Sequence, residues 1–333
     1  MARALGPPSP NLPAVLEPVA GDLERVGQRY REILGDVSWR TREMAAQAAR
    51  FGGKRLRPSL TCIAARVAGG GVTAEVATAA AIVELIHTAT LVHDDVLDGA
   101  AVRRRVATVN ARWGDGLAVL VGDVLFSKAY HAAARLEDRF ASRYLSEVVG
   151  EILEGEIHQD VVSRSTSVGE DEYRAIIRGK TAALYEAALV VGAHYGGAPE
   201  LGPRLGRFGH HLGMAFQIVD DRLDLSGDED AMGKTLGRDL REGKMTLPVI
   251  VWLRDRPASD RAEALSLIEA AWDDDARAAD LCGRLARDGA LAAADQAARA
   301  EADLALAELR ALPEGEPRDL LASLADYVAQ RRA

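Results

Sequence analysis

Residues 94–98 read Asp-Asp-Val-Leu-Asp and residues 220–224 read Asp-Asp-Arg-Leu-Asp, so the chain carries two copies of the pattern D-D-x-x-D. Each copy follows a long apolar segment with helical spacing. Positions four apart share a helix face, so three carboxylates crowd into one turn and repel one another. The dipole near a helix C-terminus disfavours them further. Divalent cations would offset this repulsion, and Mg2+ is bound through a few carboxylates plus substrate phosphates. The two motifs therefore predict a diphosphate held between two facing, metal-binding helices.

The predicted metal ligands are the aspartates of the two motifs, namely Asp94, Asp95, Asp98, Asp220, Asp221 and Asp224. One such cluster alone could equally be a solvated acidic face, and it is the second copy that favours a metal site. An EF-hand is excluded, because the loop glycine and the terminal bidentate glutamate of that motif are missing.

The composition argues against several other classes of protein. A chain of 333 residues that is 48% hydrophobic can bury a large core. Its net charge of -9 makes it a poor nucleic-acid binder. Cys62 and Cys282 lack metal-type spacing and suit a reducing cytoplasm. We expect no signal peptide, and the apolar runs are interrupted by charge before the roughly 20 residues needed to span a bilayer.

The distribution of proline indicates the fold class. Five of the 12 prolines lie in the first 18 residues, and none occurs over residues 59–198. Proline breaks helix interiors, and this stretch is rich in helix-forming residues without the alternation of strands. We predict an all-α protein of about a dozen helices, with a loose tail over residues 1–15 and a single domain over 16–333. Helices are expected over 18–51, 73–98, 117–135, 171–195 and 205–225, with another ending near 154–156.

Basic residues gather at two points beside these motifs. Lys54, Arg55 and Arg57 stand in a turn before a helix, and Arg103, Arg104 and Arg105 follow Asp98 closely. Arginine forks and lysine charges suit phosphate oxygens. Solvated basic surface, or neutralisation by surface salt bridges, is the alternative reading of each cluster.

Several single residues are candidates by their spacing from the motifs. His87 lies two turns before Asp94 on the same helix face, and Gln217 lies three residues before Asp220. His93 is turned away from Asp94, so we expect a structural role for it. Lys180 and Thr181 stand on a later apolar helix, and for these two and Gln217 an ordinary surface position is as probable by spacing alone. Residues 233–244 read as a charged, glycine-rich loop whose Lys234 and Lys244 could close over the site, and a plain solvated loop is the alternative.

Taken together, these segments resemble the trans-isoprenyl diphosphate synthases of the polyprenyl synthetase family. The resemblance covers about residues 20–333 and is carried in order by FGGKRLRP at 51, ELIHTATLVHDDVLD at 84, VRR at 102, VGDVLF at 121, EGEIHQ at 154, KTAAL at 180, AFQIVDDRLDLSGDEDAMGKTLGRDLREGKMTLP at 215 and LADYVAQRR near the C-terminus. It implies an isoprenoid synthase-type helical bundle around a central cavity. It also implies a prenyltransferase that condenses isopentenyl diphosphate with an allylic diphosphate in a 1'–4 reaction.

The resemblance also implies roles for individual residues. Asp94, Asp98 and Asp220 would bind three Mg2+, assisted by the other three aspartates. The allylic diphosphate would be held by Arg103, Lys180 and Lys234, and isopentenyl diphosphate by Lys54, Arg57, His87 and Arg104. Thr181 and Gln217 would help to stabilise a carbocation. The resemblance also implies a homodimer, and the hydrophobic product suggests transient contact with lipid.

The chain departs from the family at one loop and shows small residues in its product pocket. The family usually has R-R-G-x-P-T where this chain has Arg103-Arg104-Arg105-Val106-Ala107-Thr108, so that Arg105 stands in place of the glycine and Ala107 in place of the proline. In the family, bulky residues four and five positions before the first motif shorten the product. Here those positions are Thr90 and Ala89, with Ile86 and Val83 deeper. We therefore expect a product of about C30 to C50, such as a quinone side-chain precursor, with C20 as the alternative and Leu145 or Val149 as candidate floor residues.

Three other functions compete with this interpretation. A class I terpene cyclase usually lacks a second D-D-x-x-D and a basic isopentenyl site. A regulatory subunit of a two-component synthase usually loses the catalytic motifs, which are intact here. A nucleic-acid binder built on Arg103-Arg104-Arg105 is disfavoured by the acidic chain and by its 5% aromatic content.

Overall fold

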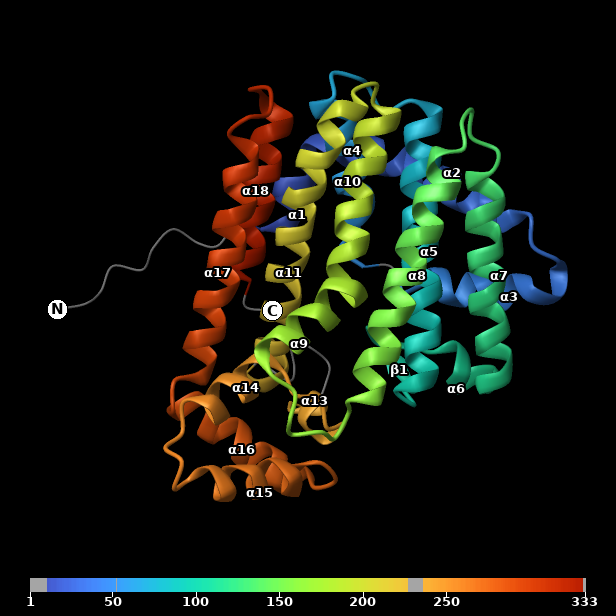
Figure 1. The fold of residues 1–333 in the computed structure, drawn as a ribbon. Coiled ribbons are helices and arrows are strands. Elements are labelled where there is room, and N and C mark those ends of the chain that lie inside the picture. Colours follow the sequence, from blue (N-terminus) through green and yellow to red (C-terminus); the bar gives the residue numbers. More distant parts are fainter. Residues whose placement is uncertain (1–10, 52, 227–235, 332–333) are drawn as a thin grey trace.

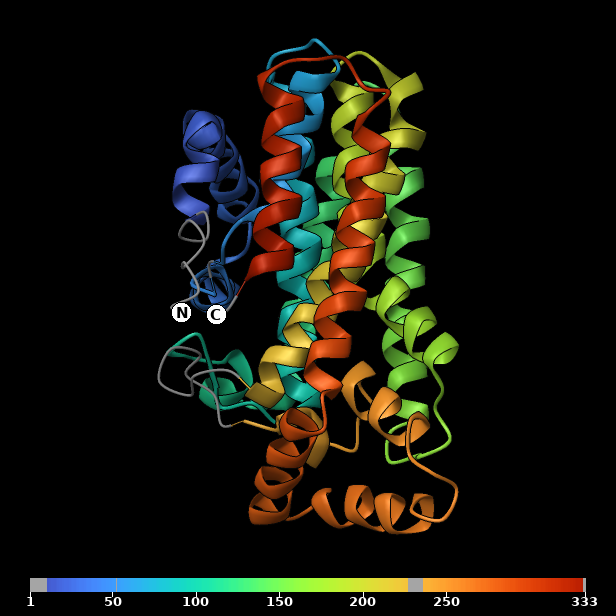
Figure 2. The ribbon, with the colours of Figure 1, turned by 90° about the vertical axis from the view of Figure 1, so that its left-hand side faces the viewer.

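The computed structural model describes residues 11–51, 53–226 and 236–331. The prediction of an all-α fold is confirmed, because long helices run side by side in a bundle that is taller than it is wide (Figures 1 and 2). Two short helices, α15 and α16, lie across one end of the bundle (Figure 2). Within the described ranges, the strands are limited to one two-stranded hairpin.

The helices of the first half are α1 (Leu12–Leu16), η1 (Glu17–Val19), α2 (Ala20–Gly35), α3 (Trp39–Ala49), α4 (Leu56–Val67), α5 (Ala74–Leu97), α6 (Val109–Trp113), α7 (Asp115–Ala133) and α8 (Phe140–Val161). Those of the second half are α9 (Glu170–Ile177), η2 (Arg178–Ala182), α10 (Ala183–Tyr195), η3 (Pro199–Leu201), α11 (Gly202–Ser226), α13 (Arg238–Arg241), α14 (Leu247–Arg254), α15 (Arg261–Ala271), α16 (Asp275–Arg287), α17 (Ala290–Leu309) and α18 (Glu316–Gln330).

The helix that carries the first motif, α5, is built as its sequence predicts. The Thr73 hydroxyl accepts a hydrogen bond from the amide of Val76 and caps the start, while Gly99 has a φ of 58° just past the end. By length and composition this 24-residue helix could cross a membrane, but 72% of its apolar window is buried inside the protein, as in a core helix.

Two boundaries near the N-terminus differ from those predicted. The single helix expected over 18–51 is divided, because α2 ends at Gly35 and α3 begins at Trp39. The tail expected over 1–15 overlaps α1, where Leu12 and Leu16 are buried and the helix contacts α18. Apolar burial against the last helix therefore orders part of a proline-rich stretch that looks unstructured in sequence.

The packing joins the two ends of the chain. The largest hydrophobic cluster includes residues of α1, α4, α5, α7, α8, α10, α11 and α18. A second cluster lies beneath α14, α15 and α16 and is shared with α11 and α17. The helices that bear the two aspartate motifs, α5 and α11, are thus held in one continuous core.

The unusual arginine loop forms the hairpin. Strand β1 (Val102–Arg103) pairs antiparallel with β2 (Val106–Ala107), and Arg104 and Arg105 form the two-residue turn with φ of 50° and 63°. A two-residue hairpin turn of type I′ needs positive φ at both central residues, which favours glycine. Arg105 therefore adopts the strained conformation that glycine would adopt without cost.

This strain predicts that Arg105→Gly stabilises the protein. We expect the free energy of unfolding to rise by about 1 kcal/mol, the cost of holding a side chain in the left-handed region. Urea denaturation followed by circular dichroism measures it. The control is Val102→Gly, an exposed strand position without positive φ, which should destabilise. An equal decrease in the free energy of unfolding of both variants would contradict the strain at Arg105.

Candidate active site

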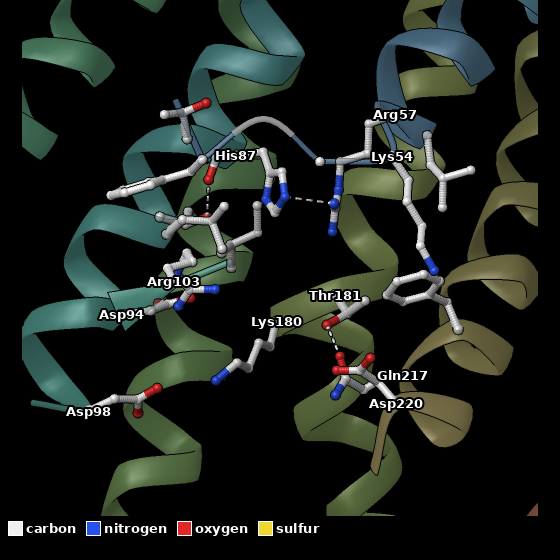
Figure 3. A pocket seen from close by; sticks show the side chains of 18 of the residues that line it. Lys54, Arg57, His87, Asp94, Asp98, Arg103, Lys180, Thr181, Gln217 and Asp220 are labelled. Atoms are coloured by element: carbon white, nitrogen blue, oxygen red, sulfur yellow. Dashed lines mark hydrogen bonds between the residues drawn. The ribbon is translucent and has the colours of Figure 1, made fainter. Parts of the chain in front are cut away.

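The two motif helices face each other across a cavity of about 890 Å³. Its walls come from the start of α4, one face of α5, the lower half of α8, η2, α11 and the segment around α13. Figure 3 shows Asp94 and Asp98 on one side, Asp220 and Gln217 on the other, and Lys180 between them. The facing arrangement predicted from sequence is therefore present.

The aspartates of the first motif divide into two groups. Asp94 and Asp98 line the cavity, whereas Asp95 is 1% exposed and does not. Burial raises the pKa of Asp94 to about 7, although Lys180 opposes the rise. Asp95 instead accepts a hydrogen bond from Arg103 Nε at 2.7 Å, which ties the hairpin to α5. Asp95 thus positions Arg103 rather than presenting its carboxylate to the cavity.

All three aspartates of the second motif line the cavity, but they differ in how far neighbouring groups engage them. The side chain of Asp220 is 52% exposed toward the cavity. Both oxygens of Asp221 are engaged, by the Tyr173 hydroxyl at 2.6 Å and by Gln217 Nε2 at 2.7 Å. Burial and the nearby Asp239 hold the pKa of Asp221 well above its usual range. One oxygen of Asp224 accepts the backbone N–H of Asp239 at 3.0 Å.

Lys180 reaches the centre of the cavity through an irregular helix. It lies in η2, a π-helical turn, where one extra residue per turn shifts the side chains. Close packing of α8 against this turn depends on Gly155 and Gly179. A Cβ at Gly155 would lie 2.7 Å from the backbone nitrogen of Lys180, and a Cβ at Gly179 would lie 2.9 Å from the backbone oxygen of Glu151. Lys180 Nζ donates to Glu156 at 2.8 Å. Burial lowers the pKa of Lys180, but Glu156 and Asp94 raise it more, so the ammonium stays charged.

A basic corner lies beside the first motif. Arg57 Nη1 and His87 Nε2 are 3.1 Å apart, and the Arg57 guanidinium lies 4.5 Å from the centre of the Tyr185 ring. Burial, and then Arg57, hold the pKa of His87 well below its usual range, so the imidazole is neutral and can donate only one hydrogen bond. Arg104 Nη1 donates to the Phe51 carbonyl at 2.5 Å. Lys54 is exposed, with its ammonium 5.6 Å from the Tyr327 ring centre.

Most of the predicted substrate-binding residues share this cavity. Those that line it are Lys54, Arg57, His87, Arg103, Arg104, Lys180, Thr181 and Gln217. The Thr181 hydroxyl donates to Gln217 Oε1 at 2.7 Å, so these two residues act as one unit. Lys234 lies outside the described residues. His93 bonds the Val119 carbonyl on α7 at 3.0 Å, in keeping with the structural role expected for it.

The predicted chain-length residues are separated by the geometry of α5. Thr90 lines the cavity, but Ala89 and Ile86 are fully buried and do not. Successive residues turn by about 100°, so Thr90 lies about 40° from Asp94 around the helix and Ala89 about 140°. Leu145 and Val149 do not line the cavity either, and on α8 its wall begins at Ile152.

Sequence reasoning missed several residues that support the site. Glu156 and Tyr173 hold Lys180 and Asp221 respectively, and no motif spacing distinguishes a buried hydrogen-bond partner of this kind. Arg238 and Arg331 form ion pairs with Asp98 and Asp220. These contacts join positions more than 100 residues apart, so only the folded chain shows them.

The donor set fits a hard divalent cation. The cavity-facing groups of the motifs are carboxylate oxygens, the ligands that Mg2+ prefers. Among the residues that the structure describes, no three acidic, histidine or cysteine side chains converge tightly enough to hold an ion alone. Ions bound by Asp94, Asp98 and Asp220 would thus share their coordination with phosphate oxygens and water.

The fold and the site together define a helical synthase of the class that handles prenyl diphosphates. The sequence model of the family described as polyprenyl synthetase matches residues 40–283. An octaprenyl diphosphate synthase from Escherichia coli is 36% identical over 331 residues, covering 96% of this chain and 99% of that protein. A short chain isoprenyl diphosphate synthase from Methanothermobacter thermautotrophicus is 37% identical over 314 residues, covering 92% of this chain and 96% of that protein.

A solved structure agrees with these relatives. The polyprenyl synthase from Caulobacter crescentus, complexed with calcium and isoprenyl diphosphate, has a TM-score of 0.91 and 33% identity, over 98% of this chain and 100% of that one. The chain therefore belongs to the polyprenyl synthetase family. It is an enzyme of the prenyl diphosphate synthase type, and the family is in general Mg2+-dependent.

Proposed function

We propose that this enzyme condenses isopentenyl diphosphate with an allylic diphosphate to form an all-trans polyprenyl diphosphate. The observation that carries the proposal is the cavity itself, in which two aspartate helices face each other and the basic corner at Arg57 lies beside them. A terpene cyclase would need a single diphosphate site, whereas this cavity offers cationic groups in two places.

The chain's own residues set up the chemistry. Lys180 and Arg103 lie where the allylic diphosphate would bind and counter the negative charge that grows on it as the C–O bond breaks. Mg2+, when bound, adds Lewis-acid stabilisation of that leaving group. Arg57 and the neutral His87 would hold isopentenyl diphosphate so that its double bond attacks the allylic cation. The proton lost afterwards would pass to the released diphosphate.

Apolar walls protect the cation from water. Ile152, Ile177 and Phe216 line the cavity between the charged groups. The Thr181–Gln217 unit adds an oxygen dipole close to the second motif. Exclusion of water keeps the cation from being quenched before the double bond reaches it. Three Mg2+ per site, held by Asp94, Asp98 and Asp220, would complete the arrangement.

The product is proposed to be long, about C30 to C50, with C20 as the alternative. Support comes from Thr90, the small residue that lines the cavity one turn before Asp94. The relatives cover both outcomes, since one is named an octaprenyl and another a short chain synthase. We place the enzyme in the cytoplasm, where its two buried free cysteines stay reduced, with brief lipid contact during product release.

A homodimer is proposed from an apolar surface on two neighbouring helices. On α7, Leu117 and Leu120 are 43% and 59% exposed, and on α8, Ile157 and Val161 are 62% and 77% exposed. The two helices contact each other. Large exposed apolar residues that gather in this way mark interaction sites, and a second copy of the chain would cover them.

The activity is tested with purified protein, labelled isopentenyl diphosphate, Mg2+ and C10, C15 or C20 allylic primers. We expect a ladder of products ending at C30 or longer, and no turnover when Mg2+ is chelated or isopentenyl diphosphate is omitted. Asp94→Asn should reduce kcat by at least about a hundredfold, because a ligand to the ionising diphosphate is lost. Product formation from the allylic primer alone would identify a cyclase instead.

The pocket argument is tested by Thr90→Phe, which should shorten the product to about C15 or C20 because an aromatic ring would block the cavity below Asp94. Thr90→Val, of similar volume, should leave the ladder unchanged. Ala89 is buried in the core, so we expect Ala89→Tyr to lower the free energy of unfolding by about 1–3 kcal/mol through overpacking. An unaltered product length in Thr90→Phe would contradict the proposed path of the chain.

The dimer is tested by sedimentation velocity. We expect the wild-type chain to sediment as a dimer, and Leu120→Glu combined with Ile157→Glu to sediment as a monomer, because buried charge opposes association. Leu304→Glu is the matched control, since Leu304 is 50% exposed on α17. A monomeric wild-type protein would refute the interface.

A further inference from the structure

The last described residue of the chain takes part in the active-site cavity. Arg331 follows α18 directly, lines the cavity and is only 7% exposed. One guanidinium nitrogen donates to Asp220 Oδ1 at 2.6 Å, and the guanidinium carbon lies 4.4 Å from the centre of the Phe216 ring. A residue at the far end of the sequence therefore covers the exposed aspartate of the second motif.

Arg331 is held there by a residue inside the motif. Arg222 occupies the first variable position of Asp-Asp-Arg-Leu-Asp, and its Nη2 donates to the Arg331 carbonyl at 3.1 Å. Arg222 Nε also lies 3.1 Å from an oxygen of Asp295 on α17. Arg222 contacts the carbonyl oxygen of Arg331, so it positions the backbone of this residue without using the guanidinium.

Arg331 has donor capacity to spare. Its Nε is buried and has no hydrogen-bond partner. A guanidinium carries five N–H donors in a planar fork, which matches the paired oxygens of a phosphate better than one carboxylate oxygen. A buried donor without a partner destabilises the folded chain, and an anion in the cavity would remove this penalty.

The first motif shows the same arrangement. Asp98 Oδ2 lies 3.1 Å from Arg238, and its Oδ1 lies 3.5 Å from Lys244. Both cations also pair with Glu242, each at 2.6 Å. In both motifs, then, carboxylate oxygens that suit a metal ion already have a cationic partner from the C-terminal part of the chain.

We propose that Arg331, positioned by Arg222, is an exchangeable counter-ion that neutralises Asp220 until a divalent cation binds this carboxylate, and then binds the diphosphate that accompanies the metal. The inference rests on the proposed function, because it takes the diphosphate as substrate. A metal ion alone would displace Arg331 and leave two cations side by side. A metal ion with diphosphate gives Arg331 a new anionic partner. Metal and diphosphate should therefore bind with positive cooperativity that depends on Arg331.

The test is isothermal titration calorimetry with Mg2+ alone, and with inorganic pyrophosphate at saturating Mg2+. Removal of the competing cation in Arg331→Gln should tighten the binding of Mg2+ alone by about three- to tenfold, the size expected for one partly buried ion pair. The same variant should bind pyrophosphate more weakly by about tenfold, because a charge-assisted contact is lost. Opposite shifts of the two affinities are the result that supports exchange.

Matched variants separate exchange from a structural effect. Arg331→Lys keeps the charge but loses the fork, so Mg2+ affinity should stay near wild type while pyrophosphate binding weakens. Arg222→Gln should shift both affinities in the directions of Arg331→Gln but less. Arg207→Gln, which breaks a surface pair with Glu308, should change neither. Circular dichroism confirms that each variant is folded.

Two results would overturn the inference. One is an unchanged or weakened Mg2+ affinity in folded Arg331→Gln, and the other is an unchanged pyrophosphate affinity. Neither depends on turnover, so these outcomes are distinct from failure of the proposed function, which would appear as a wild-type enzyme that binds Mg2+ and pyrophosphate but does not incorporate isopentenyl diphosphate.

Discussion

Repulsion between carboxylates is the constraint on which the rest of this structure depends. Two motifs place five of their six aspartates on the wall of one cavity, and burial raises the cost of their charge further. The aspartates have two different roles. Asp95, Asp221 and Asp224 accept hydrogen bonds from Arg103, Tyr173 and the Asp239 amide, respectively. Asp94, Asp98 and Asp220 line the cavity and form ion pairs or lie near cationic side chains. The supporting aspartates are thereby kept in place by neighbours, and the other three face cations.

The cations come from many parts of the chain, and this dispersion explains the architecture. Lys180 lies in a π-helical turn, Arg103 lies in a strained hairpin, and Arg331 directly follows α18. Each is carried by an irregular element or a terminus, whereas the aspartates sit on regular helices. A regular scaffold fixes the metal-binding side, and irregular elements bring positive charge to it from outside the scaffold.

Much of this could be predicted from the sequence, for definable reasons. The fold class followed from proline-free, helix-forming segments, and the position of α5 from its cap at Thr73 and its stop at Gly99. The motif aspartates and His87 followed from spacing along single helices, which is local information, whereas the roles of Lys180, Thr181 and Gln217 followed from the resemblance to the family. The partners across the cavity did not, because Glu156, Tyr173 and Arg238 are chosen by tertiary packing. The division of the first long helix at Gly35 and the inward direction of Ala89 likewise depend on what packs against each helix.

The contact between α8 and the π-helical turn has a consequence for how the wall of the cavity can change in evolution. Gly155 and Gly179 let the two backbones touch, and a Cβ at either would lie within 3 Å of the opposing chain. Two backbones in such contact cannot slide past each other without a clash, so this part of α8 is held against the π-helical turn. At this contact the wall of the cavity can change through the side chains that line it, such as Ile152, but not through a shift of α8 along the turn.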